Sequence, residues 1–284
     1  MSLSYAVLLG IIQGITEFLP ISSTAHLTIA GKVLGLIDPS HPEEWTAFIA
    51  IMQLGTVAAV MIYFSGDVIS MIRAFLRDWN YTSPGVKRQW SVESRLLGII
   101  IVGTLPVAII GVAFKHIIEG TFTKELSTIA SSLIVLALIL LWAERAGKRT
   151  RSVEQTTIID GIIIGFAQAC ALIPGSSRSG TTITAGLFRG LTREAAARFS
   201  FLLSIPAVLA SGFFELYEAR HHLSGLGITP LIVSTLIAGI VGYAAIAYLL
   251  RYLRTHSTAV FIVYRIVLGG VIWALILSKN PWFA

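Results

Sequence analysis

Long stretches without charged side chains constrain this sequence more than any other feature. A helix that crosses the hydrocarbon core of a bilayer needs about 20 mainly apolar residues. Six segments come close to this length; five contain no charged residue, and the sixth contains only Arg265. We therefore predict six membrane-spanning helices. They cover Thr46–Phe64, Leu96–Phe114, Leu126–Ala143, Phe199–Phe214, Leu226–Leu250 and Thr258–Ser278.

The composition agrees with an integral membrane protein and excludes two other classes. Of the 284 residues, 55% are hydrophobic and 13% are charged, whereas soluble domains carry about 25% charged residues. Disordered chains need low hydrophobicity and many charges, so the same figures exclude disorder. The single cysteine, Cys170, excludes an intrachain disulfide and a thiolate metal cage. We expect an all-α polytopic membrane protein with a single membrane domain over 1–284.

Two further apolar segments are each interrupted by a proline. In Met1–Gly31 the interruption is Pro20, and in Gly161–Phe188 it is Pro174. Proline removes a backbone donor and clashes with the preceding helical turn, so each segment should break near its middle. Non-helical backbone at membrane depth is tolerated only inside protein or beside a water-filled cavity. We predict that both segments are re-entrant helical hairpins with a polar turn at depth.

Basic residues are distributed unevenly between the two ends of the predicted spans. Fourteen of the 21 Lys and Arg fall in the segments 65–95, 144–151, 189–198 and 251–254, which lie at one end when the spans are threaded in order. Cytoplasmic loops carry an excess of Lys and Arg, so this end is predicted to be cytoplasmic. The opposite end has five Lys and Arg beside seven acidic residues. The first hairpin then enters from outside, and the second enters from the cytoplasm.

The two hairpin sequences are similar to each other. GIIQ at 10–13 leads to PISS at 20–23, and GFAQ at 165–168 leads to PGSS at 174–177. Each half of the chain then holds one hairpin and three spans. Because three is an odd number of crossings, the second half is inverted relative to the first. We predict inverted pseudo-repeats over 1–155 and 156–284, which place a site near the midplane where the broken helices meet.

Polar and ionisable side chains gather at the two predicted turns. Ionisable groups inside a bilayer are costly, and they are candidates for functional residues. The inverted arrangement brings a carboxylate and an imidazole from the first turn to a guanidinium from the second. The first turn supplies Gln13, Glu17, Ser22, Ser23, Thr24 and His26, and the second supplies Ser176, Ser177, Arg178, Ser179, Thr181 and Thr182.

The second turn has the features of an anion-binding site. The segment SSRSGTT at 176–182 follows a helix break and opens a half-helix, whose free N–H groups and positive dipole end attract anions. Arg178 adds a planar guanidinium suited to bidentate phosphate contact. A G-x-x-x-x-G-K-[ST] motif is absent from the sequence, so a nucleotide is not indicated. We assign phosphate binding to Ser22, Thr24, Ser176, Ser177, Ser179 and Thr182.

Side chains of the first turn add groups that can bind a cation and transfer a proton. The Glu17 carboxylate beside the Gln13 carboxamide can hold a divalent cation, Mg²⁺ or Ca²⁺, through oxygen ligands. His26 can transfer a proton near neutral pH. Ser23 is either a nucleophile or only a hydrogen-bond donor. We therefore predict Glu17, Ser23, His26 and Arg178 as catalytic residues.

Each of these residues also has a structural interpretation. Glu17 and Arg178 can form a buried structural ion pair. The hydroxyls of Ser22–Thr24 can cap the returning helix, and His26 can be a hydrogen-bonded helix residue. Arg265 lies within a span without a recognisable motif, and a structural pairing or snorkelling role is favoured for it.

At these residues the sequence resembles the bacterial undecaprenyl-diphosphate phosphatases, also called bacitracin-resistance proteins. The segment QGITEFLPISSTAH at 13–26 is similar to the family's first motif, a Glu or Gln, three residues, then Glu. The segment PGSSRSGTT at 174–182 is similar to the second. The stretch around QLG at 53–55 and the pair Tyr264-Arg265 are also similar, and the resemblance covers nearly the whole chain.

The resemblance implies hydrolysis of undecaprenyl diphosphate to undecaprenyl phosphate and inorganic phosphate. This reaction recycles the lipid carrier for peptidoglycan synthesis, and higher activity confers bacitracin resistance. The resemblance also implies a divalent cation, and a catalytic core of Glu17, His26 and Arg178 with Ser23 and Ser177 close by. Gln13 stands where some members have Glu, which removes one carboxylate from the cation site.

Two routes to phosphate release fit these residues. Either Ser23 attacks while His26 takes its proton, which gives a phosphoserine, or a water polarised by Glu17 and His26 attacks directly. The competing class is a transporter or flippase for a phosphorylated lipid, because such proteins also use inverted repeats with broken helices.

The expected setting is the bacterial plasma (inner) membrane, with the active site opening to the extracytoplasmic side. The expected partners are undecaprenyl diphosphate and the lipid bilayer. A homodimer is compatible with the sequence, and no nucleic-acid partner is expected.

Overall fold

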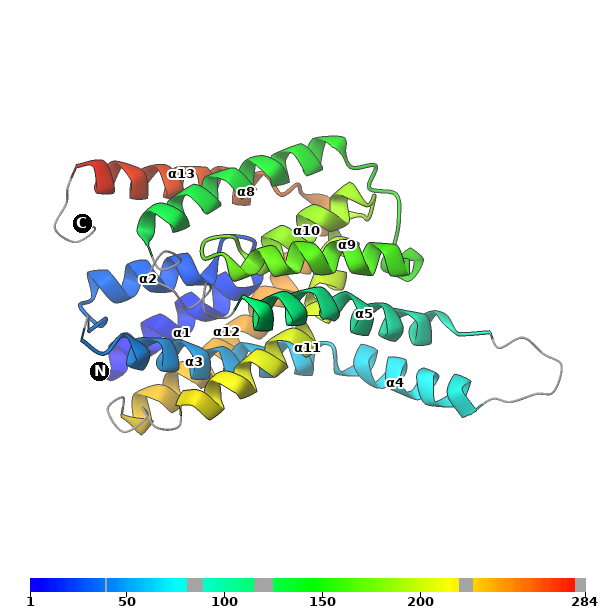
Figure 1. Cartoon of the computed structure of the whole chain (residues 1–284), viewed down its shortest axis with the longest axis horizontal. Coiled ribbons are helices and arrows are strands. Elements are labelled where there is room, and N and C mark those ends of the chain that lie inside the picture. Colours follow the sequence, from blue (N-terminus) through cyan, green and yellow to red (C-terminus); the bar gives the residue numbers. More distant parts are fainter. Residues whose placement is uncertain (39, 81–88, 115–124, 220–226, 279–284) are drawn as a thin grey trace.

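The computed structural model describes residues 1–38, 40–80, 89–114, 125–219 and 227–278, and in these ranges the chain is helical (Figure 1). The prediction of an all-α chain is confirmed, since the β-type pairing within these ranges is limited to an isolated bridge between Arg151 and Leu191. The helices are α1 (Leu3–Phe18), α2 (Ser23–Val33), α3 (Pro42–Tyr63), α4 (Ser65–Asn80), α5 (Val92–Ala113), α8 (Leu126–Ala146), α9 (Ile158–Ala169), α10 (Arg178–Phe188), α11 (Arg193–Ala219), α12 (Ile228–Thr255) and α13 (Ala259–Leu277), with 3₁₀ turns η1 (Val153–Gln155) and η2 (Cys170–Leu172).

Six of these helices are long and apolar enough to cross a membrane, and they correspond to the six predicted spans. They are α3, α5, α8, α11, α12 and α13. Their outward faces are apolar: Val112 is 82% exposed and Ile240 is 69% exposed. So large an exposed apolar surface is stable in lipid and not in water, and the protein is an integral membrane protein. Leu226, the first residue of one predicted span, lies outside the described residues.

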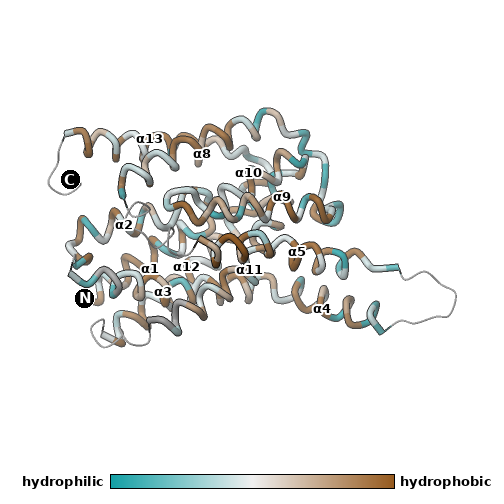
Figure 2. The backbone as a smooth tube through the Cα atoms, in the orientation of Figure 1, coloured by the Kyte–Doolittle hydropathy of each residue, from teal (hydrophilic) through white to brown (hydrophobic). Residues whose placement is uncertain are grey.

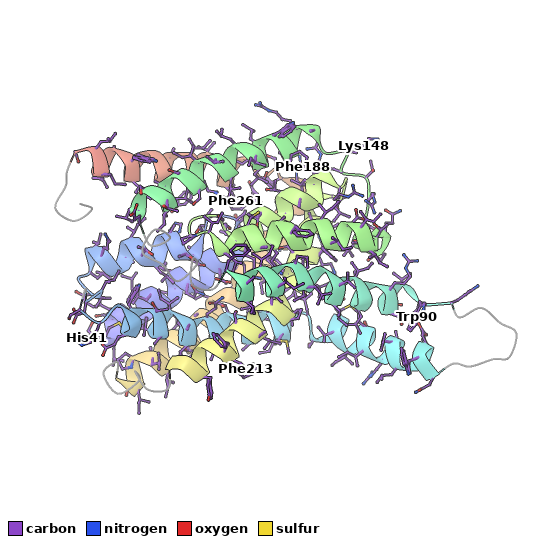
Figure 3. All side chains as sticks on the ribbon, viewed as in Figure 1. His41, Trp90, Lys148, Phe188, Phe213 and Phe261 are labelled. Carbon is purple, nitrogen blue, oxygen red and sulfur yellow. The ribbon has the colours of Figure 1, made fainter. Side chains whose placement is uncertain are left out.

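The hydropathy of the chain changes along the length of the bundle. Figure 2 shows hydrophobic residues along the helices and hydrophilic residues at the connection between α8 and α9 and toward the far end of α4. In Figure 3, His41 lies at one end of the bundle, and Lys148 and Trp90 lie at the other. The two ends are those that the charge distribution predicts to be extracytoplasmic and cytoplasmic, respectively.

The two proline-interrupted segments form helical hairpins, as predicted. α1 ends at Phe18, just before Pro20, and α9 ends at Ala169, where η2 leads to Pro174. Both α1 and α9 are shorter than the candidate spans. In Figure 1, α1 starts at the left end of the bundle and α9 at the right end, and the turns of the two hairpins meet in between.

Glycines let the first helix of each hairpin approach a spanning helix closely. A Cβ on Gly165 of α9 would lie 2.0 Å from the carbonyl oxygen of Gly103 of α5. A Cβ on Gly10 of α1 would lie 2.6 Å from the carbonyl oxygen of Ser234 of α12. No side chain fits at these distances, and small residues are what membrane helices use for such contacts. These contacts fix the depth at which each turn lies.

The segment 65–95, predicted only as a loop, contains helix α4 and the start of α5. α4 follows α3 almost directly and extends past the other helices (Figure 1). Asp78, near its end, accepts hydrogen bonds from Ser94 Oγ at 2.6 Å and from Ser91 Oγ at 2.7 Å. These two hydroxyls, Ser94 first, hold the pKa of Asp78 well below its usual range. The Asp78 carboxylate therefore joins the end of α4 to the start of α5.

Part of the basic excess at the predicted cytoplasmic end is paired with two buried carboxylates. Asp160, at the start of α9, binds Arg151 and Arg189, each at 2.6 Å. In the last turn of α8, the Glu144 carboxylate binds two further arginines of this end, Arg149 and Arg193. These pairs tie the ends of α8, α9, α10 and α11 together. Seven residues of the charge count lie outside the described residues: Lys87, Arg88, Lys115, Glu119, Lys124, Arg220 and Lys279.

Candidate active site

The first turn joins α1 to α2 and ends at Ser22. Ser22 has a φ of +75°, a conformation that side chains other than glycine rarely adopt. Its Oγ accepts a hydrogen bond from the backbone N–H of Ala25 at 3.4 Å and so caps α2. Ser23 is the first residue of α2, and Thr24 follows it with an exposed side chain.

The second turn repeats this geometry before α10. Ser177 has a φ of +66°, and its Oγ accepts from the backbone N–H of Gly180 at 3.2 Å. Helix capping is therefore the structural role of Ser22 and Ser177. The backbone N–H groups of Ser177, Arg178 and Ser179 bond to no other described residue. Because the first N–H groups of a helix have no partner within it, the start of α10 has donors free for an anion.

Glu17 and Arg178 bring the two turns together, as the sequence predicted. Arg178 Nη2 donates to Glu17 Oε1 at 2.6 Å. The other carboxylate oxygen, Glu17 Oε2, accepts from Ser23 Oγ at 2.8 Å and from Gln13 Nε2 at 3.2 Å. Gln13 and Glu17 are buried. One carboxylate thus connects the guanidinium of the second turn with the hydroxyl and the amide of the first.

The imidazole of His26 has partners other than Ser23. Its Nδ1 lies 2.7 Å from the carbonyl oxygen of Ser22, so Nδ1 carries a proton and donates. Its Nε2 lies 2.6 Å from the hydroxyl of Tyr264, and the two rings are within 7° of parallel. The Ser23 hydroxyl donates to Glu17 instead. The interpretation of His26 as a hydrogen-bonded helix residue therefore describes this structure.

The other predicted phosphate-binding residues differ in what they contact. Ser179 Oγ donates to a carbonyl oxygen of the first turn at 3.1 Å and adds a second link between the turns. Thr182 Oγ1 lies 2.5 Å from Ser200 Oγ, so it joins α10 to α11. Thr24 is exposed, whereas Ser176 is fully buried. Ser179 therefore links the two turns, and Thr182 holds α10 against α11.

Three buried polar atoms at the two turns have no hydrogen-bond partner among the described residues: Gln13 Oε1, Ser176 Oγ and Arg178 Nη1. An unpaired buried polar atom costs about 1–3 kcal/mol, so these atoms are suited to a ligand. Arg178 Nη1 is a free N–H donor of the kind that phosphoryl oxygens accept from. Gln13 Oε1 and the Glu17 carboxylate are oxygen donors of the kind that hard cations prefer. In the described part of the chain, no group of three or more His, Cys, Asp or Glu side chains could hold a metal ion.

Two apolar cavities meet at His26. One, of about 380 Å³, lies between α1 and α13 and is lined mainly by aliphatic side chains together with Tyr264. The other, of about 340 Å³, lies between α1 and α2 and includes Leu268 of α13. Ile12 and His26 line both cavities. The apolar cavities therefore adjoin the first turn at Leu19, Ile21 and His26.

Three polar residues near the turns were not predicted as site residues. Tyr264 binds His26, and Gln168 has a buried amide with no partner among the described residues. Arg265 is fully buried, and its Nη2 donates to the carbonyl oxygen of Ser176 at 2.9 Å. Full burial excludes the snorkelling role considered for Arg265, and its guanidinium pairs with backbone carbonyl oxygens. The resemblance at Tyr264-Arg265 was a signal for two of these residues. The similarity of the two hairpin sequences, which aligns Gln168 with Gln13, was a signal for the third.

Comparison with known proteins identifies the family. The model of the family described as bacitracin resistance protein BacA matches residues 6–271. The chain belongs to this family. It is 52% identical over 272 residues to an undecaprenyl-diphosphatase of Syntrophobacter fumaroxidans, with 96% of each chain covered. A protein with the same name from Myxococcus xanthus is 50% identical, and the match covers 97% of this chain and 90% of the relative. One from Chlorobaculum tepidum is 49% identical, with 95% of each chain covered.

Proposed function

We propose that this protein is an undecaprenyl-diphosphatase, which hydrolyses undecaprenyl diphosphate to undecaprenyl phosphate and inorganic phosphate. It thereby recycles the lipid carrier for peptidoglycan synthesis and confers bacitracin resistance. Relatives about 50% identical over nearly the whole chain carry this name. The observation that carries the proposal is the junction of Glu17 and Arg178, where an acid, a guanidinium and a hydroxyl meet beside free helix N–H groups.

The chain's own residues supply phosphate binding and charge stabilisation. Arg178 Nη1, which has no partner among the described residues, and the N–H groups at the start of α10 bind the phosphoryl oxygens. Charge spreads over these oxygens as the phosphorus–oxygen bond to the bridging oxygen loosens, and fixed donors stabilise it. Residues from both hairpins are needed, because the binding donors come from the second turn and the carboxylate comes from the first.

The hydrogen bond from Ser23 to Glu17 supports a serine nucleophile. Ser23 Oγ lies 2.8 Å from a carboxylate oxygen that can accept its proton. Ser23 Oγ attacks the terminal phosphorus, undecaprenyl phosphate leaves with the bridging oxygen, and a phosphoserine remains. A water molecule then attacks the phosphoserine, which releases inorganic phosphate and returns the proton to Ser23.

A divalent cation, Mg²⁺ or Ca²⁺, is part of the proposal. Gln13 Oε1 is buried without a partner among the described residues, and it lies on the same side chain that donates to Glu17. These oxygen atoms fit a hard cation. When bound, the cation would neutralise charge on the diphosphate.

We further propose that 1–155 and 156–284 are inverted pseudo-repeats. Ser22 and Ser177 both have positive φ angles, and both cap the N–H group three residues onward. The packing supports the same relation: α1 lies against α12 at Gly10, and α9 lies against α5 at Gly165. Each hairpin thus packs on the second span of the opposite half.

The site is proposed to open to the extracytoplasmic side of the bacterial plasma (inner) membrane. The basic excess supports a cytoplasmic location for the end of α8 and the start of α11, which meet at Glu144. The first hairpin then starts from the outer face, and the diphosphate enters there. The apolar cavities beside His26 give the isoprenoid chain a place next to the site.

Phosphate release by detergent-purified protein tests this function. A phosphatase releases inorganic phosphate from undecaprenyl diphosphate without any membrane gradient, and a transporter or flippase for a phosphorylated lipid does not. We expect release by the wild type, its suppression by EDTA, and its recovery with Mg²⁺ or Ca²⁺. Absence of release under all of these conditions would contradict the phosphatase, and release that EDTA leaves unchanged would contradict the cation.

A further inference from the structure

The charges around the second turn are not balanced within the described residues. Arg178 is paired with Glu17 at 2.6 Å. Arg265, on α13, reaches the same turn and is fully buried, but no described carboxylate pairs with it. Of the two guanidinium groups at the second turn, only that of Arg178 therefore pairs with a described carboxylate.

The position of Arg265 makes this excess charge costly. A Cβ on Gly180 would lie 2.6 Å from Arg265 Nη1, so the guanidinium lies against the first turn of α10, which is the positive end of the helix dipole. Nη1 and Nε have no hydrogen-bond partner among the described residues. A buried cation without a counter-ion is strongly unfavourable. An anion bound at the turn would remove this cost, and a phosphoryl group carries about −1.5 to −2 charges near pH 7.

Arg265 also orients the backbone of the turn. Its Nη2 donates to the carbonyl oxygen of Ser176 at 2.9 Å and approaches that of Gly175 at 3.4 Å. In a trans peptide the C=O and N–H groups point in opposite directions. With the Ser176 carbonyl directed at Arg265, the N–H of Ser177 points away from it, and this N–H bonds to no other described residue.

We propose that Arg265 is a positioning residue of the phosphate site: it directs the Ser177 N–H toward the bound phosphate and supplies the second positive charge that the diphosphate requires. This inference rests on the proposed function. It extends the site beyond the two hairpins to α13, a span outside both sequence motifs.

The effect of phosphate on thermal stability distinguishes a positioning role in the phosphate site from a purely structural role, in which Arg265 only holds the turn in place. Arg265→Gln removes the charge, and Arg265→Lys keeps the charge but loses the planar fork. Arg193→Gln is the matched control, because Arg193 is a partly buried arginine whose partner Glu144 lies away from the turns. For each purified protein, the thermal midpoint is measured with and without inorganic phosphate, and kcat and KM are measured with undecaprenyl diphosphate.

We expect phosphate to raise the midpoint of the wild type and of Arg193→Gln, and not that of Arg265→Gln. Turnover by Arg265→Gln should fall about 100-fold, as for the loss of one oxyanion donor, and Arg265→Lys should recover part of both properties. Without phosphate, Arg265→Gln should unfold at or above the wild-type midpoint, because it removes an unpaired buried charge.

Three results would overturn the inference. The first is an Arg265→Gln variant that keeps the phosphate-dependent shift and turns over within threefold of the wild type. The second is an Arg265→Gln variant whose thermal midpoint without phosphate falls as much as that of Arg193→Gln, while phosphate still raises its midpoint. The third is failure of both Arg265 variants to fold, since that would make the residue structural. A wild type that neither releases phosphate nor responds to it would instead contradict the proposed function.

Discussion

At the scale of single residues, Glu17 is the centre of the site. Its two oxygens are shared between Arg178 on one side and Ser23 and Gln13 on the other. A carboxylate in this position orients the guanidinium and can accept the proton of Ser23. His26 is hydrogen-bonded to Ser22 and Tyr264 instead of to Ser23, and it borders the apolar cavities.

Replacement of Ser23 tests the proposed nucleophile. We expect Ser23→Ala to lower turnover by about 10³-fold or more, because the covalent route is lost. Wild-type enzyme quenched during turnover of labelled substrate should carry phosphate on Ser23. The control is Ser40→Ala, which changes an exposed serine of the α2–α3 connection. Turnover by Ser23→Ala within tenfold of the wild type would assign the attack to water.

At the scale of helices, close packing at glycines sets the depth of the turns. On α5, a Cβ at Gly103 would lie 2.7 Å from the carbonyl oxygen of Gly161 of α9, whereas a Cβ at Gly111 would meet nothing within 4 Å. The same helix therefore offers a test and its control.

We expect Gly103→Ala to lower the free energy of unfolding by about 1–3 kcal/mol, since overpacking shifts the second hairpin. Gly111→Ala should leave it unchanged or raise it by up to about 1 kcal/mol, because alanine favours helix more than glycine does. Denaturant unfolding of the purified proteins in detergent measures both. Equal effects of the two substitutions would show that the hairpin is not held by this contact.

The helices that the sequence predicts are those with simple physical signals. Apolar length identifies the six spans, and Pro20 and Pro174 identify the breaks. α4 was not predicted, because it is amphipathic and lacks a long apolar run. The Glu17–Arg178 contact was predictable from the similarity of the two hairpin sequences and from the charge count. The Tyr264–His26 and Arg265–Ser176 contacts were not, because they depend on how α13 packs against the hairpins.

At the scale of the molecule, the orientation in the membrane decides which leaflet supplies the substrate. Ser40 is exposed in the α2–α3 connection, and Lys148 is exposed in the α8–α9 connection. These connections lie at the predicted extracytoplasmic and cytoplasmic ends of the bundle, respectively. In a Cys170→Ala background, we expect Ser40→Cys to react with a membrane-impermeant maleimide in intact cells. Lys148→Cys should react only after the cells are opened. The reverse pattern would contradict an extracytoplasmic opening.

The central claim is that the junction of the two hairpins is the phosphatase site, and Arg178 tests it most directly. Phosphate release from undecaprenyl diphosphate is measured for purified wild type and Arg178→Ala, with thermal unfolding as the check on folding. We predict that Arg178→Ala stays folded and loses activity by about 10³-fold or more, as when a charge-stabilising arginine is removed in phosphoryl transfer. A folded Arg178→Ala protein with close to wild-type turnover would contradict the account.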